Sequence, residues 1–129
     1  MGQTQSIGNR GESAVAEYIA KKGYIISARN YRSKYGEIDI IAENNDEILF
    51  VEVKTRSKNS FGKPQDYVNH PKKRRIFITA SIYLRSNGFG LKPRFDVAEV
   101  MILGSETLEV NYIENAFGVD AFENFKSTL

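Results

Sequence analysis

The sequence contains no cysteine, no tryptophan and a single histidine among its 129 residues. The absence of cysteine excludes a disulfide scaffold and metal sites built from thiolates, and one histidine cannot form a His-rich zinc site. No apolar run approaches the roughly 20 residues that a membrane-spanning helix needs, and the N-terminus lacks the basic and then apolar pattern of a signal peptide. We therefore expect a cytoplasmic protein that does not associate with membranes.

The residues that are present have the balance of one globular domain. Hydrophobic residues make up 41% and charged residues 26% of the chain, which is typical of folded rather than disordered proteins. We predict a single domain over 1–129, with a core over about 7–114 and a C-terminal tail over 115–129. The three phenylalanines of this tail either pack on the domain or bind a partner.

Basic residues are concentrated in the first 103 positions, which hold 17 Lys and Arg against 11 Asp and Glu, whereas residues 104–129 hold 1 against 5. Two basic clusters stand out, KKRR at 72–75 and KTRSKNSFGK at 54–63. A basic face on a small domain indicates a polyanionic partner such as nucleic acid. The alternative is that these charges only keep the protein in solution.

Hydrophobic periodicity and turn residues predict seven elements. Helices are predicted over 8–23 and 71–88, and strands over 24–30, 36–43, 47–54, 92–103 and 107–114. Gly23 and Gly88 are expected to end the helices, and Pro71 suits a first helical turn. The order α-β-β-β-α-β-β predicts an α/β domain with a mixed central sheet of about five strands flanked by helices, one on each face or both on one.

Carboxylates interrupt the two apolar strands of the predicted hairpin over 36–54. Strand alternation assigns one face to Glu37, Asp39 and Ile41, and the other to Ile38, Ile40 and Ala42. In the following strand one face takes Ile48, Phe50, Glu52 and Lys54. Both strands are otherwise so apolar that we expect both faces to be covered, and carboxylates on a covered face need a partner.

A two-residue turn at 45–46 would set the register of this hairpin. Asp39 then lies opposite Glu52, with about 5 Å between their Cβ atoms, and Glu37 lies opposite Lys54. Two opposed like charges destabilise a sheet, so either one carboxyl is protonated or a cation lies between them. A hard divalent cation such as Mg²⁺ fits this position. The alternative is a solvated hairpin face that carries a Glu37–Lys54 pair.

The two predicted helices also carry candidate site residues. Glu12 lies on or beside the packing face of the first helix, or else it is a first-turn residue that complements the helix dipole. Lys73 is expected to point toward the sheet, because it shares a stripe with Ile76, Phe77, Ala80 and Leu84. The neighbouring basic residues are expected to fan outward, toward a phosphate backbone: Lys72, Arg74 and Arg75.

The ordered set Glu12, Asp39 and Glu52-Val53-Lys54 resembles the signature of PD-(D/E)xK nucleases, although Ile38 stands where that signature often has proline. From residue 7 to about 103 the chain also resembles the YraN-type uncharacterised protein family, a predicted endonuclease group similar to archaeal Holliday-junction resolvases. The motifs that carry this similarity are GNRGESAVAEYI, RNYR, GEIDIIA, FVEVKTR, FGKP, KKRRI and PRFDV.

This resemblance implies a restriction-endonuclease-like fold and a metal-dependent endonuclease that acts on DNA, including branched DNA. It implies that Asp39, Glu52 and the carbonyl of Val53 ligate Mg²⁺ or Mn²⁺. Lys54 would then orient the attacking water, and Glu12 would assist a metal-bound water. A homodimer is also implied, since branched-DNA enzymes of this fold usually work as dimers. Contacts to nucleic acid are expected from Arg56, Lys58, Lys63, Lys72, Lys73, Arg74 and Arg75.

Two other classes of function fit part of the sequence. One is a catalytically silent nucleic-acid-binding module that keeps the nuclease fold, and the other is a Mg²⁺-dependent phosphatase for a small molecule. Two basic clusters favour a long polyanion over a small substrate. The complete set of Asp39, Glu52 and Lys54 favours catalysis over binding alone.

Overall fold

The computed structural model describes residues 7–57, 69–88, 90–105, 107–118 and 121–122. Within these residues it contains two helices and five strands. Their order along the chain is α1 (Ile7–Lys21), β1 (Ile25–Ser33), β2 (Gly36–Glu43), β3 (Glu47–Ser57), α2 (His70–Asn87), β4 (Lys92–Ile102) and β5 (Leu108–Ile113). The predicted order α-β-β-β-α-β-β is confirmed, and β1 and β3 each run three residues beyond their predicted ends.

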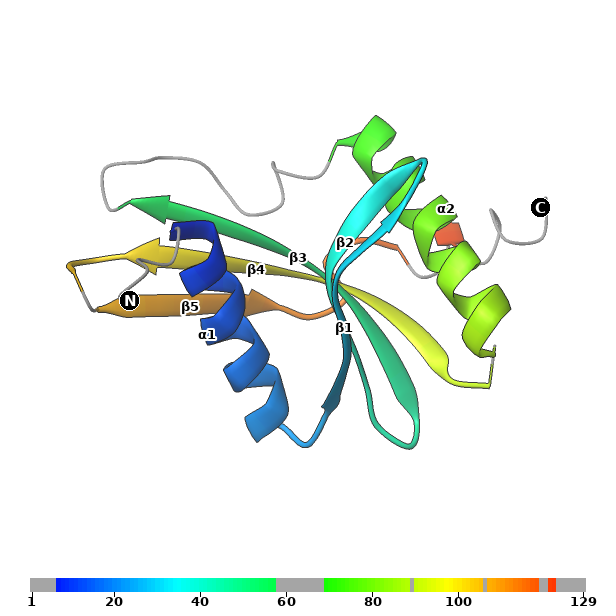
Figure 1. Cartoon of the computed structure of the whole chain (residues 1–129), viewed down its shortest axis with the longest axis horizontal. Coiled ribbons are helices and arrows are strands. Elements are labelled where there is room, and N and C mark those ends of the chain that lie inside the picture. The colour runs from blue at the N-terminus through cyan, green and yellow to red at the C-terminus, as the bar shows by residue number, and fades with distance from the viewer. Residues whose placement is uncertain (1–6, 58–68, 89, 106, 119–120, 123–129) are drawn as a thin grey trace, which may run out of the picture.

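The strands form one mixed sheet in the spatial order β1-β2-β3-β4-β5. Neighbouring strands are antiparallel except β3 and β4, which are parallel because α2 carries the chain back between them. Figure 1 shows a strongly twisted sheet with α1 and α2 on opposite sides. This α/β arrangement has the element order of the restriction-endonuclease-like fold. Neither helix in the described part of the chain is long and apolar enough to cross a membrane.

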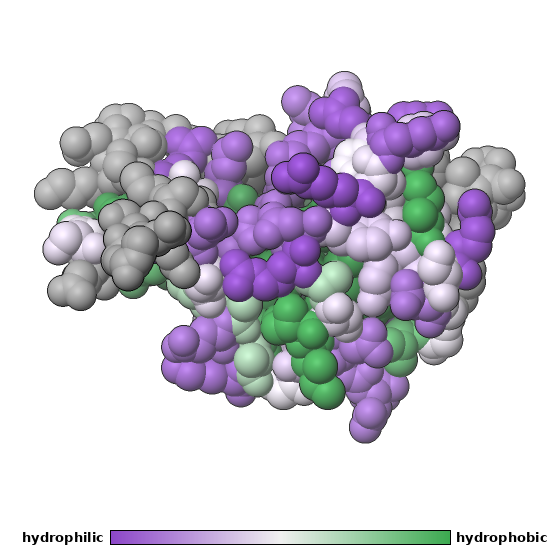
Figure 2. Space-filling model, viewed as in Figure 1, coloured by the Kyte–Doolittle hydropathy of each residue, from purple (hydrophilic) through white to green (hydrophobic). Residues whose placement is uncertain are grey.

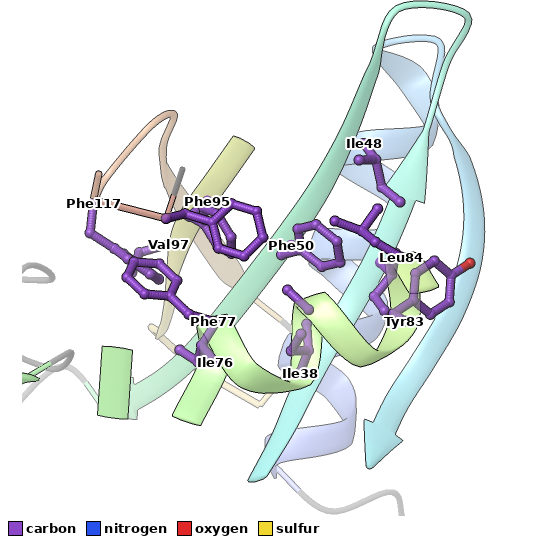
Figure 3. Packing of buried hydrophobic residues seen from close by; sticks show 13 residues of the cluster. Ile38, Ile48, Phe50, Ile76, Phe77, Tyr83, Leu84, Phe95, Val97 and Phe117 are labelled. Carbon is purple, nitrogen blue, oxygen red and sulfur yellow. The ribbon is translucent and has the colours of Figure 1, made fainter. Parts of the chain in front are cut away.

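One hydrophobic core lies between the sheet and α2, and we call it the α2-side core. Figure 3 shows Phe77 pointing from α2 toward Phe95 on β4, with Phe50 on β3 beside it. The ring centroids of Phe77 and Phe95 are 5.0 Å apart, and those of Phe50 and Phe95 are 5.3 Å apart. The buried stripe predicted for the second helix is confirmed. The members of this core are Ile38, Ile41, Ile48, Phe50, Ile76, Phe77, Ala80, Tyr83, Leu84, Phe95, Val97, Phe117 and Phe122.

A second, smaller core lies between the sheet and α1, and we call it the α1-side core. Val15 and Ile19 of α1 are spaced four residues apart, so they lie on one helical face and pack together on the strands. Alternating residues of β2, β3 and β4 complete this core, namely Ile40, Ala42, Leu49, Val51, Ala98 and Val100. The central strands are therefore covered on both faces, which explains their nearly continuous apolar sequences.

The start of the C-terminal segment packs on the domain. Phe117 and Phe122 are buried in the α2-side core, with ring centroids 5.4 and 5.0 Å from that of Phe95. The amide of Ala116 donates to the carbonyl oxygen of Phe95 at 2.8 Å, which holds this segment beside β4. Of the two alternatives expected for the three phenylalanines, packing is thus observed for two of them, and Phe125 lies outside the described residues.

Both helices end at glycines with positive φ, as predicted. Gly23 has φ 98° and Gly88 has φ 103°, a backbone region that residues with a side chain rarely adopt. At the start of α2 the side chain of Asn69 accepts a hydrogen bond from the amide of Lys72 at 3.0 Å, and Pro71 lies in the first turn. This cap fixes the backbone of Lys72 and so the point from which its side chain extends.

Candidate functional site

The strands β2 and β3 separate at Asp39. Their ladder runs from Glu43–Ile48 to Ile40–Val51, and this register is the one predicted from the turn at 45–46. One residue beyond Ile40, the Asp39 carboxylate accepts a hydrogen bond from the amide of Val53 at 2.7 Å. Meanwhile β2 stays paired with β1 as far as Gly36. The β1–β2 hairpin therefore leaves β3 at this point and rises toward the start of α2 (Figure 1).

The predicted faces of β2 are wrong at Ile38. Ile38 packs in the α2-side core together with Ile41, whereas Ile40 belongs to the α1-side core. The alternation of the strand is broken between Ile38 and Ile40, because the strand turns as it leaves β3. Asp39 stands at this break. Its carboxylate therefore interacts with charged side chains from both faces of the sheet.

Asp39 and Glu52 come together in a cavity of about 190 Å³, which is lined by Gly36, Glu37, Asp39, Glu52, Lys72, Arg75 and Ile76. The pKa of Asp39 is raised from 3.8 to about 7, mainly by burial and next by the negative charge of Glu52. The hydrogen bond from the Val53 amide opposes this rise in pKa without cancelling it. The structure thus produces the crowded carboxylate pair that the register predicted.

Glu12 approaches the same site from α1. A Cβ atom on Gly11 would lie 2.1 Å from the Thr55 hydroxyl oxygen, so only glycine lets α1 lie this close to β3. The first turn of α1 contains no acidic residue, and the helix-dipole alternative for Glu12 is therefore wrong. Its side chain is 13% exposed and lies 3.4 Å from the Arg29 guanidinium. The charge of Glu12 also contributes to the raised pKa of Asp39.

Lys72 points into the site, so the outward direction predicted for its side chain is wrong. The Lys72 ammonium forms an ion pair with Oε2 of Glu52, whereas the Lys73 ammonium lies 5.9 Å from the centre of the Phe117 ring. Side chains four residues apart on a helix lie above one another. Lys72 therefore follows Ile76 into the cavity, and Lys73 follows Phe77 toward Phe117.

The tip of the β1–β2 hairpin forms the outer wall of the cavity. A Cβ atom on Gly36 would lie 3.1 Å from Cβ of Arg75, so the hairpin passes very close to α2. The hydroxyl groups of Ser33 and Thr79 are hydrogen-bonded at 2.9 Å, which joins the tip to the helix. Arg75 lines the cavity from an exposed position, and Arg74 is also exposed. Figure 2 shows hydrophilic side chains at this end of the molecule.

Glu37 does not lie opposite Lys54 as predicted, because β2 has already left β3 at that position. Its carboxylate instead lies 3.2 Å from Nε of Arg32, its neighbour on β1. Lys54 is partly buried on β3, two residues after Glu52, and the regular pairing of β3 with β4 keeps both side chains on one face.

Two predicted nucleic-acid contacts, Lys58 and Lys63, lie outside the described residues. A third, Arg56, is only 19% exposed, and its Nε lies 3.6 Å from the carboxylate of Glu99 on β4. Sequence reasoning missed Glu99. The signal was present in PRFDVAEV, where two carboxylates interrupt an apolar strand just as they do in GEIDIIA.

The donor atoms of the site fit a hard divalent cation. Asp39 and Glu52 supply carboxylate oxygens, and the backbone carbonyl of Val53 lies between Glu52 and Lys54 in the chain. No group of three His, Cys, Asp or Glu side chains suited to a metal ion occurs among the described residues. Mg²⁺ usually keeps several waters and takes only one or two protein carboxylates, so two carboxylates and one carbonyl form a sufficient set.

Comparisons with known proteins identify the family of this chain. The model of the "Uncharacterised protein family UPF0102" matches residues 11–100, which include all four proposed catalytic residues. A UPF0102 protein of Alkaliphilus metalliredigens is 47% identical over 115 residues, covering 88% of this chain and 99% of the relative. One from Caldanaerobacter subterraneus is 44% identical, covering 88% and 95%, and one from Persephonella marina is 39% identical, covering 88% and 94%. The chain belongs to the UPF0102 family.

Proposed function

We propose that this protein is a metal-dependent endonuclease that hydrolyses phosphodiester bonds in DNA, with branched DNA among its substrates. One observation supports this most strongly. Asp39 and Glu52 share a partly buried cavity at the point where β2 and β3 separate, and Lys54 follows on the face that carries Glu52. A carboxylate pair with a nearby lysine is the set that phosphodiester hydrolysis needs.

Each residue has a distinct task in this proposal. Asp39, Glu52 and the Val53 carbonyl hold Mg²⁺ or Mn²⁺, which supplies a water of lowered pKa and positive charge beside the phosphate. Lys54 orients the attacking water and stabilises the negative charge that develops on the phosphate oxygens. Glu12, on the α1 side of Asp39, accepts a hydrogen bond from water there and so orients it.

Binding to the nucleic acid is assigned to the basic residues around the start of α2. Lys72 and Arg75 line the cavity itself, and Arg74 is exposed beside them. Such contacts neutralise phosphates without reading bases, so we propose binding that is largely indifferent to sequence. For branched DNA we propose a homodimer, which presents two sites to one substrate, and light scattering on the purified protein tests it.

A second candidate is a nucleic-acid-binding module without catalysis. The observation that favours it is the ion pair between Lys72 and Glu52, which neutralises one proposed metal ligand with a side chain of the protein itself. If this ion pair persists in every state, the site binds phosphates through Lys72 and Arg75 and hydrolyses nothing.

A cleavage panel distinguishes the two candidates. Duplex, flap, four-way-junction and single-stranded DNA are each incubated with the wild-type protein in Mg²⁺, in Mn²⁺ and in chelator. The nuclease proposal predicts metal-dependent products on at least one substrate and none from Asp39→Asn. The binding-module proposal predicts gel shifts without products from both proteins. Circular dichroism confirms that the variant is folded.

A further inference from the structure

Lys72 forms an ion pair with Glu52, a proposed metal ligand. Its ammonium contacts Oε2 of Glu52, whose side chain is only 8% exposed, while the Lys72 side chain is 31% exposed. The ammonium therefore reaches from solvent into the cavity where Asp39 and Glu52 meet. Arg75 is the second basic residue that lines this cavity.

The backbone of Lys72 is held in place, whereas its side-chain ammonium can move. The amide of Lys72 donates to the Asn69 side chain at 3.0 Å, and this cap holds the first turn of α2. Four rotatable carbons separate that backbone from the ammonium. Arg75 lies one turn further along α2, lines the same cavity and is exposed. A rotation of the Lys72 side chain therefore moves its charge away from Glu52 within the cavity that Arg75 also lines.

We propose, on the basis of the proposed function, that Lys72 is an exchangeable counter-ion of Glu52. In the metal-free protein Lys72 neutralises Glu52. Glu52 exchanges this ammonium for a divalent cation, because the ammonium and the cation would repel each other at one carboxylate. Lys72 then turns to the phosphate on which the site acts and binds it together with Arg75. Phosphate binding and metal binding thus favour each other through one side chain.

Mn²⁺ binding without nucleic acid tests the first half of this proposal. Isothermal titration compares the wild type with Lys72→Met, which keeps the length of the side chain and removes its charge. We expect Mn²⁺ to bind Lys72→Met roughly fivefold more tightly, the scale of an ion pair with one partly exposed partner. Lys73→Met makes the same change of net charge at the next residue, outside the cavity, and is expected to bind Mn²⁺ like the wild type.

The coupling tests the second half. The titration is repeated with a short duplex oligonucleotide and Ca²⁺, so that binding is measured apart from cleavage. The oligonucleotide should tighten Ca²⁺ binding severalfold in the wild type and in Lys73→Met, and much less in Lys72→Met. A lysine that only stabilises the fold would change melting temperature without changing this coupling.

The outcomes separate this proposal from the proposed function. Equal Mn²⁺ affinities of the wild type, Lys72→Met and Lys73→Met would overturn the role of Lys72, and metal-dependent cleavage by the wild type would still support the nuclease. If neither the wild type nor Lys72→Met binds Mn²⁺, both proposals are wrong. If only Lys72→Met binds it, the wild type does not exchange the ammonium for a cation, which overturns this proposal and favours the binding-module candidate.

Discussion

Two regions of this domain contain buried carboxylates, and the surroundings of the two carboxylates differ. Asp96 on β4 is fully buried, and its oxygens accept hydrogen bonds from the Arg94 guanidinium at 2.9 Å, from the Tyr112 hydroxyl at 2.5 Å and from the Asn115 amide at 2.8 Å. Asp39 accepts a hydrogen bond from the Val53 amide and lies beside the carboxyl group of Glu52. The first carboxylate is surrounded by hydrogen-bond donors, whereas the second lies beside another carboxylate at the wall of a cavity.

The electrostatics of the neighbours show the same difference. Burial alone would lower the pKa of Arg94, but its hydrogen bonds and charge interaction with Asp96 outweigh burial and raise it. Burial and the charge of Asp96 also raise the pKa of Tyr112, so both donors stay protonated. Around Asp39, in contrast, both Glu52 and Glu12 add negative charge. A carboxyl whose pKa is raised by burial and by neighbouring carboxylates at a cavity indicates a functional site rather than a structural one.

The largest expected effect is on chemistry at Lys54. Lys54→Ala should lower the single-turnover cleavage rate by about 10²- to 10³-fold, because the lysine acts mainly on the charge that develops in the transition state. Mn²⁺ affinity should stay within about twofold, since Asp39 and Glu52 remain. Rapid-quench kinetics and calorimetry on one preparation measure both quantities. A loss of metal binding as large as the loss of rate would assign Lys54 to the metal site instead.

The next effect is on stability at Asp96. Asp96→Ala leaves the charge of Arg94 without its main partner, and we expect it to lower the free energy of unfolding by about 3–5 kcal/mol. Urea denaturation followed by circular dichroism measures this change. The cleavage rate per folded molecule should be unchanged, because the network and the cavity lie apart. Equal losses of stability and intrinsic rate would mean that the two regions are one unit.

Asp39→Asn should have the opposite effect on stability. Because the pKa of Asp39 is about 7 in the folded protein and 3.8 in the unfolded chain, the folded state holds this proton more tightly. Stability from this group is therefore highest at low pH and falls as the pH rises from about 4 to about 7. At pH 8 without metal, Asp39→Asn should be more stable than the wild type by about 1–2 kcal/mol.

The control for this change is Asp46→Asn, which removes an exposed carboxylate from the hairpin turn. Urea denaturation at pH 4.5 and at pH 8 compares the three proteins. Asp46→Asn should have the same free energy of unfolding as the wild type at both pH values. Asp39→Asn should be more stable than the wild type only at pH 8. An equal increase in stability at pH 4.5 and pH 8 would show that the ionised Asp39 carboxylate does not destabilise the folded state.

The smallest effect concerns binding at Arg75. Arg75→Ala should weaken DNA binding roughly threefold to tenfold and reduce the slope of log K against log salt by about 0.9, the value for one phosphate contact on duplex DNA. Single-turnover cleavage at saturating protein should stay nearly intact. Arg85→Ala, at the exposed far end of α2, is the matched control. Fluorescence anisotropy over a salt series gives the slope, and a salt-independent affinity would contradict electrostatic binding.

Local patterns were sufficient to predict the elements and the register of the hairpin. The turn at 45–46 fixes the pairing of Ile40 with Val51, because the turn and its strands are adjacent in sequence. The break at Asp39 was not predictable in this way. It depends on where β2 leaves β3, and that is decided by the docking of the hairpin tip on α2 through Ser33 and Thr79, far apart in the chain.

The contacts made by the basic residues also could not be predicted from the sequence. Lys72 and Lys73 both border the apolar stripe of α2, and only the positions of Glu52 and Phe117 decide which lysine enters the cavity. Arg94 and Asp96 alternate on one strand, a pattern that signals a charged face. In the structure they instead close a network with Tyr112 on β5. Such long-range pairs require the fold before they can be recognised.

The most direct test of the nuclease site is Glu52→Gln, compared with Glu17→Gln on the exposed face of α1, outside the cavity. Mn²⁺ affinity and single-turnover cleavage are measured for both variants and for the wild type, with DNA binding measured in chelator. We expect Glu52→Gln to lose Mn²⁺ affinity and to cleave about 10²- to 10³-fold more slowly, while its metal-free DNA binding persists or tightens because one repelling charge is gone. Glu17→Gln should behave as the wild type. Metal-dependent cleavage that survives Glu52→Gln unchanged would contradict the account.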